Sequence, residues 1–290
     1  MRLAGLQKLT LLDFPGQIAC TVFTPGCNLR CPFCHNPDLV LPPLLSEEDL
    51  LPEETFFDFL QKRKGKLTGV AVTGGEPTLQ PDLPRFLARI REMGFGVKLD
   101  TNGCRPQVLK EIVNAHLVDY VAMDVKNCPG KYALTTGIPE KRTGELWNTV
   151  LESIFFLMER HVAYEFRTTV VGGLHTTEDI LQLAHLLRGA DQWFLQQYHP
   201  ADDVVGDFLP NGGLGGFMGD VLSNAGSGDA MGDFSPNAGS NGVQGDPLPP
   251  SETGSEPGSV QGLYEPSVQM LEEMRREASV YVPSVRTRGI

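Results

Sequence analysis

The chain has 290 residues, of which 21% are charged and 41% hydrophobic, and its formal net charge is −12. Such an acidic chain lacks the basic face of a general nucleic-acid-binding protein, so we expect no nucleic-acid partner. No run approaches the ~20 continuous apolar residues that span a bilayer, so we expect no membrane partner and a cytoplasmic location. The length suits one large core, as in single-domain α/β barrels.

Apolar, β-rich runs alternate with helical patterns along the chain. Strands are expected near Ile18–Thr24, Thr68–Thr73, Gly96–Asp100, Tyr120–Asp124, Ala163–Val171 and Trp193–Tyr198. Helices are expected at Ser46–Lys62, Pro81–Met93, Pro106–Ala115, Gly144–Arg160 and Thr177–Leu187. Six strand-helix steps predict a parallel sheet with helices on its outside, and the alternation fits a closed barrel or an open sheet. Active sites of such folds form on the loops that follow the strands.

The segment 205–262 differs in composition from the rest. It holds fifteen of the 32 glycines and seven acidic residues, with no Lys or Arg. Its few large apolar groups cannot offset the entropy lost on ordering. We therefore predict a barrel over residues 1–204, a disordered acidic insertion over 205–262, and a C-terminal part over 263–290. This last part completes the barrel domain with a helix at Pro266–Tyr281 and an extended tail.

The loop after the first predicted strand carries three closely spaced cysteines. Cys27, Cys31 and Cys34 form a C-x3-C-x2-C run. Three thiolates hold three corners of an iron-sulfur cube and leave the fourth iron open for chemistry. A zinc site made of these cysteines and His35 fits the same pattern, so both metal sites stay open at this point. Cys20, Cys104 and Cys128 are scattered, and we expect them to be structural.

The next predicted strand ends in Gly74-Gly75-Glu76-Pro77. Two glycines at the carboxyl end of a strand let a backbone approach a ligand closely. Glu76 places one carboxylate beside that ligand, where it suits an ammonium group. An ordinary strand-to-helix turn has similar glycines, so this segment alone does not decide between a binding site and a turn.

Together, the cysteine run and the Gly-Gly-Glu segment resemble the radical S-adenosylmethionine (SAM) superfamily. The resemblance implies a partial (β/α)6 barrel and a 4Fe-4S cluster on Cys27, Cys31 and Cys34. It implies that SAM chelates the open iron through its amino and carboxyl groups, and that Gly74, Gly75 and Glu76 bind the amino group. Phe33 matches the aromatic residue that members carry before the third cysteine, and Asn36 is a further candidate for cofactor binding.

Two later segments, Leu99–Gly103 (LDTNG) and Met123–Lys126 (MDVK), resemble glycyl-radical-enzyme activases. By this resemblance Asp100 and Asp124 hold a monovalent cation beside the SAM carboxylate, and Lys126 lies near the ribose or carboxylate of SAM. In the same way Arg167 matches an arginine close to SAM, and His199 matches a histidine near the adenosine. No residue is expected to act as a general acid or base.

Within this branch, several segments are similar to the anaerobic ribonucleoside-triphosphate reductase activating proteins: LQKLTLLDFPGQIACTVFTPGCNLRCPFCHNPDL, EFRTTVV, FLQQYHP and VRTRGI. The similarity implies that the partner is that reductase, a glycyl-radical protein, and that reduced flavodoxin or ferredoxin donates the electron. Asp13 matches a residue near the incoming glycyl loop, or belongs to a plain turn. Two alternatives are a radical SAM enzyme for a small molecule, such as 7-carboxy-7-deazaguanine synthase, and a zinc-binding module without catalytic activity.

Overall fold

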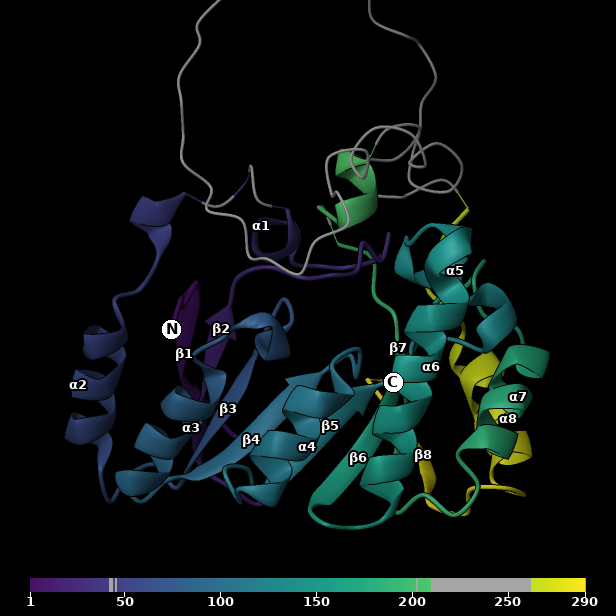
Figure 1. Cartoon of the computed structure of the whole chain (residues 1–290). Coiled ribbons are helices and arrows are strands. Elements are labelled where there is room, and N and C mark those ends of the chain that lie inside the picture. The colour runs from purple at the N-terminus through teal and green to yellow at the C-terminus, as the bar shows by residue number, and fades with distance from the viewer. Residues whose placement is uncertain (42–43, 45, 202, 210–261, 290) are drawn as a thin grey trace, which may run out of the picture.

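Eight strands form one sheet in the order β1 to β8 in this computed structural model, which describes residues 1–41, 44, 46–201, 203–209 and 262–289 (Figure 1). The strands are β1 (Gly5–Thr10), β2 (Ala19–Thr24), β3 (Gly69–Gly74), β4 (Gly96–Thr101), β5 (Tyr120–Asp124), β6 (Ala163–Val170), β7 (Trp193–Gln197) and β8 (Val285–Arg288). Strands β2 to β8 run parallel, and β1 pairs antiparallel with β2. The six predicted strands are therefore confirmed as β2 to β7, and β1 and β8 extend the sheet at its two edges.

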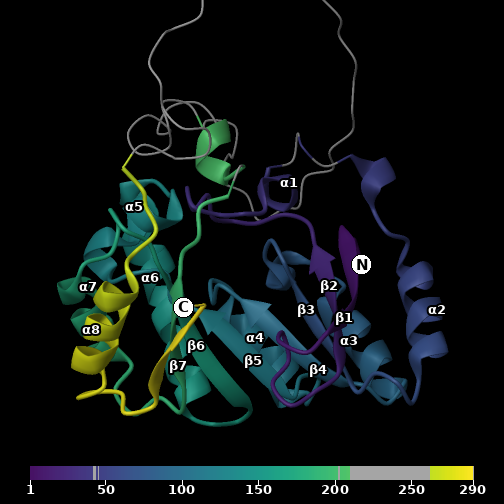
Figure 2. The same ribbon diagram turned by 180° about the vertical axis from the view of Figure 1, so that it is seen from behind.

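Helices follow the strands and cover the outer face of the sheet, as Figures 1 and 2 show from opposite sides. The long helices are α2 (Glu53–Arg63), α3 (Leu83–Glu92), α4 (Pro106–Asn114), α6 (Glu140–Met158), α7 (Thr177–Leu186) and α8 (Val268–Ala278). Parallel strands need such crossovers, because each chain segment must return to the same end of the sheet. This architecture confirms the predicted α/β fold, a partial barrel with helices on its outside.

Prolines explain two differences between the predicted and observed helix boundaries. The prediction began the first helix at Ser46, but Pro52 is the N-cap of α2, and Glu47–Asp49 form a separate 3-10 turn. Helix α6 begins at Glu140 directly after Pro139, four residues earlier than predicted. A proline has no backbone N–H and fits best at the start of a helix, so it sets the boundary in both cases.

Strand alternation separates an apolar outer layer from a polar interior. In β4, Val97 and Leu99 join the core under the helices, whereas Lys98 and Asp100 lie on the other face of the strand. The same interior holds Glu165, which is only 1% exposed and accepts hydrogen bonds from Tyr120 Oη at 3.0 Å and Arg288 Nη1 at 3.3 Å. Because Arg288 belongs to β8, this contact joins the C-terminal strand to the centre of the sheet.

Short helices lie at the carboxyl ends of the strands, above the sheet in Figure 1. They are α1 (Pro37–Val40), α5 (Tyr132–Thr136) and the 3-10 helices Pro77–Leu79, Pro129–Lys131 and Val205–Phe208. The last of these falls inside the predicted disordered segment, yet Val205 and Leu209 are buried against Val40. The described structure thus continues to Leu209 in this part of the chain, because these two apolar side chains pack against a residue that composition cannot reveal. The remainder of the predicted insertion, residues 210–261, lies outside the described residues.

The helices also bear on the expectation that the chain does not span a membrane. None of the helices among them combines the length and the apolar character that a bilayer crossing requires.

Two adjacent phenylalanines of α6 give a matched test of the core. Phe156 is buried at 7% exposure, whereas Phe155 is 54% exposed. We expect Phe156→Ala to lower the free energy of unfolding by about 3–5 kcal/mol, the usual range for a buried aromatic side chain. Phe155→Ala, with the same change in helix propensity, should shift it by less than about 0.5 kcal/mol. Urea denaturation of both variants under anaerobic conditions measures the difference, and equal losses would contradict the assigned orientation of α6.

Candidate active site

Glycines attach the cysteine-bearing loop to the end of β3. Gly75 N–H donates to the Thr24 carbonyl at 2.8 Å, and Glu76 N–H donates to the Gly26 carbonyl at 2.7 Å. A Cβ on Gly75 would lie 2.0 Å from the Gly26 oxygen, so no larger residue fits there. Gly74 has a φ of +125°, which side-chain-bearing residues rarely adopt. The Gly-Gly pair therefore lets the end of β3 meet the backbone of the cysteine loop, a contact between two backbones that the sequence analysis did not predict.

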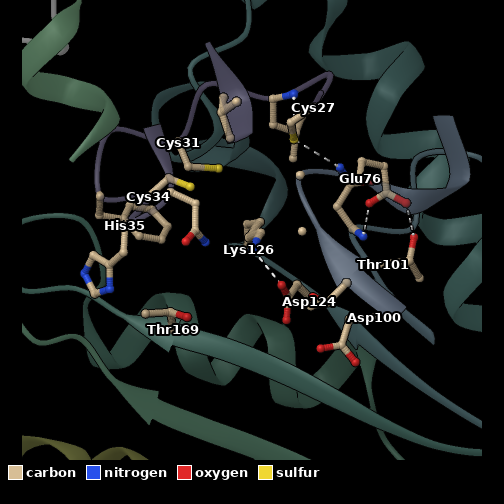
Figure 3. Close-up of a pocket in the computed structure, with 18 of the residues that line it drawn as sticks. Cys27, Cys31, Cys34, His35, Glu76, Asp100, Thr101, Asp124, Lys126 and Thr169 are labelled. Atoms are coloured by element: carbon tan, nitrogen blue, oxygen red, sulfur yellow. Dashed lines mark hydrogen bonds and ion pairs between the residues drawn. The ribbon is translucent and has the colours of Figure 1, made fainter. Parts of the chain in front are cut away.

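The three cysteines of this loop line one cavity of about 250 Å³ at the carboxyl ends of the strands (Figure 3). Burial raises the pKa of Cys27 to about 12, and it also raises the pKa values of Cys31 and Cys34. Buried thiols of this kind become thiolates when a metal supplies compensating positive charge. The site thus gathers three soft ligands that need a cationic partner.

The spacing of these cysteines bears on which metal group fits. Among the described residues, no three His, Cys, Asp or Glu side chains converge closely enough to hold a single metal ion. A zinc site requires such convergence. In an iron-sulfur cube each thiolate binds a different iron, so the sulfurs lie farther apart. Three thiols from one loop line the cavity, and this donor set suits a cluster with three liganded irons and one open iron.

Glu76 joins two of the loops that form the cavity. Its carboxylate is 1% exposed and accepts hydrogen bonds from Thr101 Oγ1 at 2.8 Å, the Asn102 N–H at 2.7 Å and the Thr78 N–H at 3.0 Å. Burial raises the pKa of Glu76, and these donors oppose the shift. Among the described residues, Oε2 accepts one hydrogen bond, from the Asn102 N–H, so it keeps acceptor capacity for an ammonium group.

Asn102 extends this connection to the cysteine loop. Its Nδ2 donates to Asn28 Oδ1 at 2.8 Å and lies 4.0 Å from Cys27 Sγ, while its Oδ1 accepts from the Cys104 N–H at 3.0 Å. Through Asn102 and Glu76, the ends of β3 and β4 fix the position of Cys27.

A network of charges forms the floor of the cavity. Asp124 accepts from Lys126 Nζ and Arg167 Nε, each at 2.8 Å, and Asp100 accepts from Arg167 Nη1 at 3.1 Å and from Lys98 Nζ. Figure 3 shows Lys126 between the cysteines and Asp124. Burial acts against ionisation of Asp124, but Arg167 and Lys126 hold its pKa below the usual value. Likewise, burial would lower the pKa of Lys126, but Asp124 and Cys31 raise it.

Aromatic side chains form the wall opposite Glu76. Phe33 is 6% exposed and its ring meets Tyr198 edge to face at 6.2 Å, while His35 lies 5.4 Å from the same tyrosine ring. The ring nitrogens of the adjacent His199 contact Glu265 Oε1 and the Gly289 carbonyl at 2.9 Å each. His199 is not among the residues that line the cavity, whereas the neighbouring Tyr198 is. The alternation of β7 explains this shift of one position, because Phe194 faces the interior and Trp193 joins the outer core.

His175 supports the site from below. It is 2% exposed, its Nδ1 accepts from the Val171 N–H at 3.1 Å, and its Nε2 contacts the Lys126 carbonyl at 2.8 Å. These two contacts assign the proton to Nε2 of a neutral ring. Burial lowers the pKa of His175, which keeps the ring in this form. His175 thereby fixes the backbone of Lys126 without touching the cavity.

The structure brings together all but one of the predicted site residues. Those that line the cavity are Cys27, Cys31, Phe33, Cys34, Asn36, Gly74, Gly75, Glu76, Asp100, Asp124, Lys126 and Arg167. Sequence reasoning missed Thr73, Thr101, Asn102, Thr169 and Tyr198, which line the same cavity. Thr101 and Asn102 directly follow Asp100 in the chain, so the end of that strand already contained the signal.

Asp13, a possible partner contact by resemblance, lies away from this cavity. It precedes β2, and its Oδ2 accepts a hydrogen bond from Thr21 Oγ1 at 2.5 Å. The neighbouring Phe14 and Gln17 line a separate depression with Gly96 and Asp119, at the amino ends of β4 and β5. Because the cysteines lie at the carboxyl ends, Asp13 fits the turn between β1 and β2.

Comparisons with known proteins agree with this geometry. A sequence profile of the radical SAM superfamily matches residues 21–187. A protein of Methanocaldococcus jannaschii, whose name assigns it provisionally to the glycyl-radical enzyme activating enzymes, is 36% identical over 208 residues, which cover 71% of this chain and 83% of that protein. A pyruvate formate-lyase-activating enzyme of Clostridium pasteurianum is 30% identical over 206 residues, which cover 68% of this chain and 82% of that enzyme.

Solved structures support the fold. The crystal structure of a radical SAM methyltransferase from Sphaerobacter thermophilus aligns with a TM-score of 0.55 at 14% identity, covering 94% of this chain and 68% of that one.

Gly75→Ala tests the contact between the two loops. The new methyl group would collide with the Gly26 carbonyl, so we expect the free energy of unfolding to fall by about 2–5 kcal/mol. As a control, Gly144 of α6 has open space where a Cβ would lie, with no atom within 4 Å, and Gly144→Ala should raise stability by about 0.5–1 kcal/mol. Urea denaturation measures both values. A Gly75→Ala protein as stable as the parent would mean that the loops do not meet here.

His175 predicts a pH dependence of stability. Its pKa is lowered by burial in the folded state, so the unfolded chain binds a proton at higher pH than the folded chain does. The free energy of unfolding should therefore be highest above about pH 6.5 and fall on acidification by up to about 1.4 kcal/mol per pH unit from this residue. His175→Asn, which keeps an acceptor for the Val171 N–H, should be less stable at neutral pH and show a shallower slope.

The control for this slope is His116→Asn, because His116 is exposed and has a φ of 53°, which asparagine tolerates. Denaturation curves between pH 5 and 8 should give the parental slope for this variant. A parental slope for His175→Asn as well would contradict the assigned role of His175.

Proposed function

Because the chain belongs to the radical SAM superfamily and is homologous to glycyl-radical enzyme activating enzymes, we propose that it activates anaerobic (class III) ribonucleoside-triphosphate reductase. The observation that carries the proposal is the convergence of three cysteine sulfurs, the Glu76 carboxylate and the Lys126 ammonium on one cavity. This set offers ligands for a 4Fe-4S cluster and ionic partners for the amino and carboxyl groups of SAM.

The donor set supports the cluster as the resident cofactor. Cys27, Cys31 and Cys34 would hold three irons and leave the fourth iron open. A bound cluster would supply one electron for the reductive cleavage of SAM to methionine and a 5′-deoxyadenosyl radical, and this radical would take a hydrogen atom from a backbone glycine of the partner.

The residues around the cysteines orient SAM and exclude water. Glu76 Oε2 would accept from the amino group of SAM, and Lys126 would pair with its carboxylate or contact its ribose. Arg167 holds the Asp124 carboxylate that positions Lys126. The rings of Phe33 and Tyr198 cover the apolar side of the cavity. Such positioning matters because the cofactors carry the reaction itself.

An external protein would donate the electron, and reduced flavodoxin or ferredoxin has suitable chemistry. The structure describes all six cysteines, and the three outside the cavity-lining run are buried at separate places: Cys20 in β2, Cys104 after β4 and Cys128 before α5. These three cysteines lie in different elements and do not form a C-x-x-C-type run of their own.

The reductase is favoured as the partner by the sequence segments that match its activating proteins, from the N-terminal hairpin to VRTRGI at the C-terminus. The Clostridium relative bears the name of an enzyme that activates pyruvate formate-lyase, so this second glycyl-radical enzyme is the main competing partner. Because each of these two proteins would have to dock at the cavity to receive the radical, mixing the chain with one or the other shows which is the partner.

Electron paramagnetic resonance on anaerobically reconstituted protein tests the proposal. The sample contains reductant, SAM and either the class III reductase or pyruvate formate-lyase from the same genome. We expect a glycyl-radical doublet with the reductase only. A doublet with pyruvate formate-lyase alone would reassign the partner, and turnover of a small molecule without any protein partner would favour an enzyme such as 7-carboxy-7-deazaguanine synthase.

Cysteine variants provide the matched control. Cys27→Ala should abolish cluster binding, SAM cleavage and the doublet, because the cluster loses one of three protein ligands. Cys20→Ala removes a buried thiol of β2 outside the cavity and should retain all three. Iron and sulfide content, together with 5′-deoxyadenosine release, report the outcome. A Cys27→Ala protein that cleaves SAM at the parental rate would refute the proposed chemistry.

A further inference from the structure

Lys98 is an unusual residue at the centre of the sheet. It lies in β4 and is 2% exposed, which makes it one of the largest fully buried side chains. Lysines are almost never fully buried unless they are paired. Its Nζ is bonded to Asp100 Oδ1, on the interior face of the strand directly below the cavity. A buried charge at this depth calls for a functional explanation.

The pairing of Asp100 and Asp124 is complete in this structure. Asp100 Oδ1 meets Lys98 and its Oδ2 meets Arg167, while Asp124 Oδ1 meets Arg167 and its Oδ2 meets Lys126. Each of the four carboxylate oxygens thus has a cationic side chain as its partner. Three cations face two carboxylates, so the network carries one net positive charge.

This arrangement does not fit the expected monovalent cation. A metal ion bound by Asp100 and Asp124 would add positive charge beside Lys98, Lys126 and Arg167, and like charges at close range are unfavourable in a buried site. A further carboxylate on the interior face, Glu165, is already paired with Arg288. No uncompensated negative charge is left in this network to attract a cation.

We propose that the Lys98 ammonium takes the place of the monovalent cation, so that the active site binds SAM without an alkali metal ion. Lys98 acts as a positioning residue: it neutralises Asp100 from below, and Asp100 in turn holds Arg167 toward Asp124 and Lys126. The inference rests on the proposed function for its ligand, SAM, whereas its charge geometry is independent of that function.

The test compares buffers of equal ionic strength that contain K⁺, Na⁺ or only tetramethylammonium, an ion too large for a carboxylate site. For the parent protein we expect SAM affinity, measured by equilibrium dialysis with labelled SAM, to differ by less than about twofold among the buffers. Thermal unfolding of the protein without SAM should likewise be independent of the cation. Loss of SAM binding or of thermal stability in tetramethylammonium would overturn the inference.

Lys98→Met should create the dependence that the parent lacks. The variant leaves Asp100 Oδ1 buried without a partner, which is strongly unfavourable, and a small cation can bind there and stabilise the folded state by mass action. We expect K⁺ or Na⁺ to raise its unfolding temperature and to strengthen SAM binding by roughly tenfold over tetramethylammonium. A variant with weakened SAM binding that no cation restores would overturn the inference.

Lys110→Met is the matched control, because it removes a lysine that pairs with Glu152 at the surface, where Lys110 is 33% exposed. This variant should behave like the parent in every buffer. If Lys98→Met does not fold, Lys98→Gln and the cation dependence of the parent still decide the question. If the parent binds SAM in none of the buffers, the proposed function fails, and the thermal measurements alone test the role of Lys98.

Discussion

The close contact between Gly75 and the Gly26 carbonyl is the constraint on which the rest of the site depends. It brings the end of β3 against the start of the cysteine loop, and the adjacent backbone hydrogen bonds hold the two together. The positions of the neighbouring site residues follow from this contact. Glu76 directly follows Gly75 and binds Thr101 and Asn102 at the end of β4, and Cys27 directly follows Gly26 at the start of the cysteine loop. A backbone contact thus sets the distance between the cysteine thiols and the Glu76 carboxylate.

Electrostatic balance is the second organising principle of the site. Buried thiols and a buried glutamate lie above a floor of three basic and two acidic side chains. Such a floor favours an anionic cluster and the carboxylate of a bound amino acid, since opposite charges attract strongly in a medium of low polarity. Because the floor is built from β4, β5 and β6, whose positions the sheet fixes, its charges need little rearrangement when a ligand binds.

Site residues that lie in short motifs at strand ends could be predicted from the sequence. Contacts between residues far apart in the sequence could be seen only in the folded chain. Cys27, Glu76 and Asp124 each lie in a short segment at the end of a predicted strand, so their common edge followed from parallel topology. The role of Lys98 did not: alternation puts Lys98 and Asp100 on the same face of β4, but nothing in that strand reveals that Arg167 of β6 pairs with Asp100. Tyr198 was missed, since a one-residue difference in alternation decides which side chain lines the cavity. The apolar contact of Val205 with Val40 was missed for a similar reason: its partner lies far away in the sequence.

The backbone bonds from Val205 N–H to the Cys34 carbonyl and from Gly206 N–H to the Pro32 carbonyl have a consequence for biosynthesis. The cysteine loop is made early on the ribosome, but two of the contacts that shape it come from residues synthesised after β7. Contacts between distant segments form late, because the chain must first close a large loop. The cysteine thiols therefore reach the arrangement described here only when most of the barrel exists. A truncated chain that ends before Val205 would present its cysteines without these two backbone contacts.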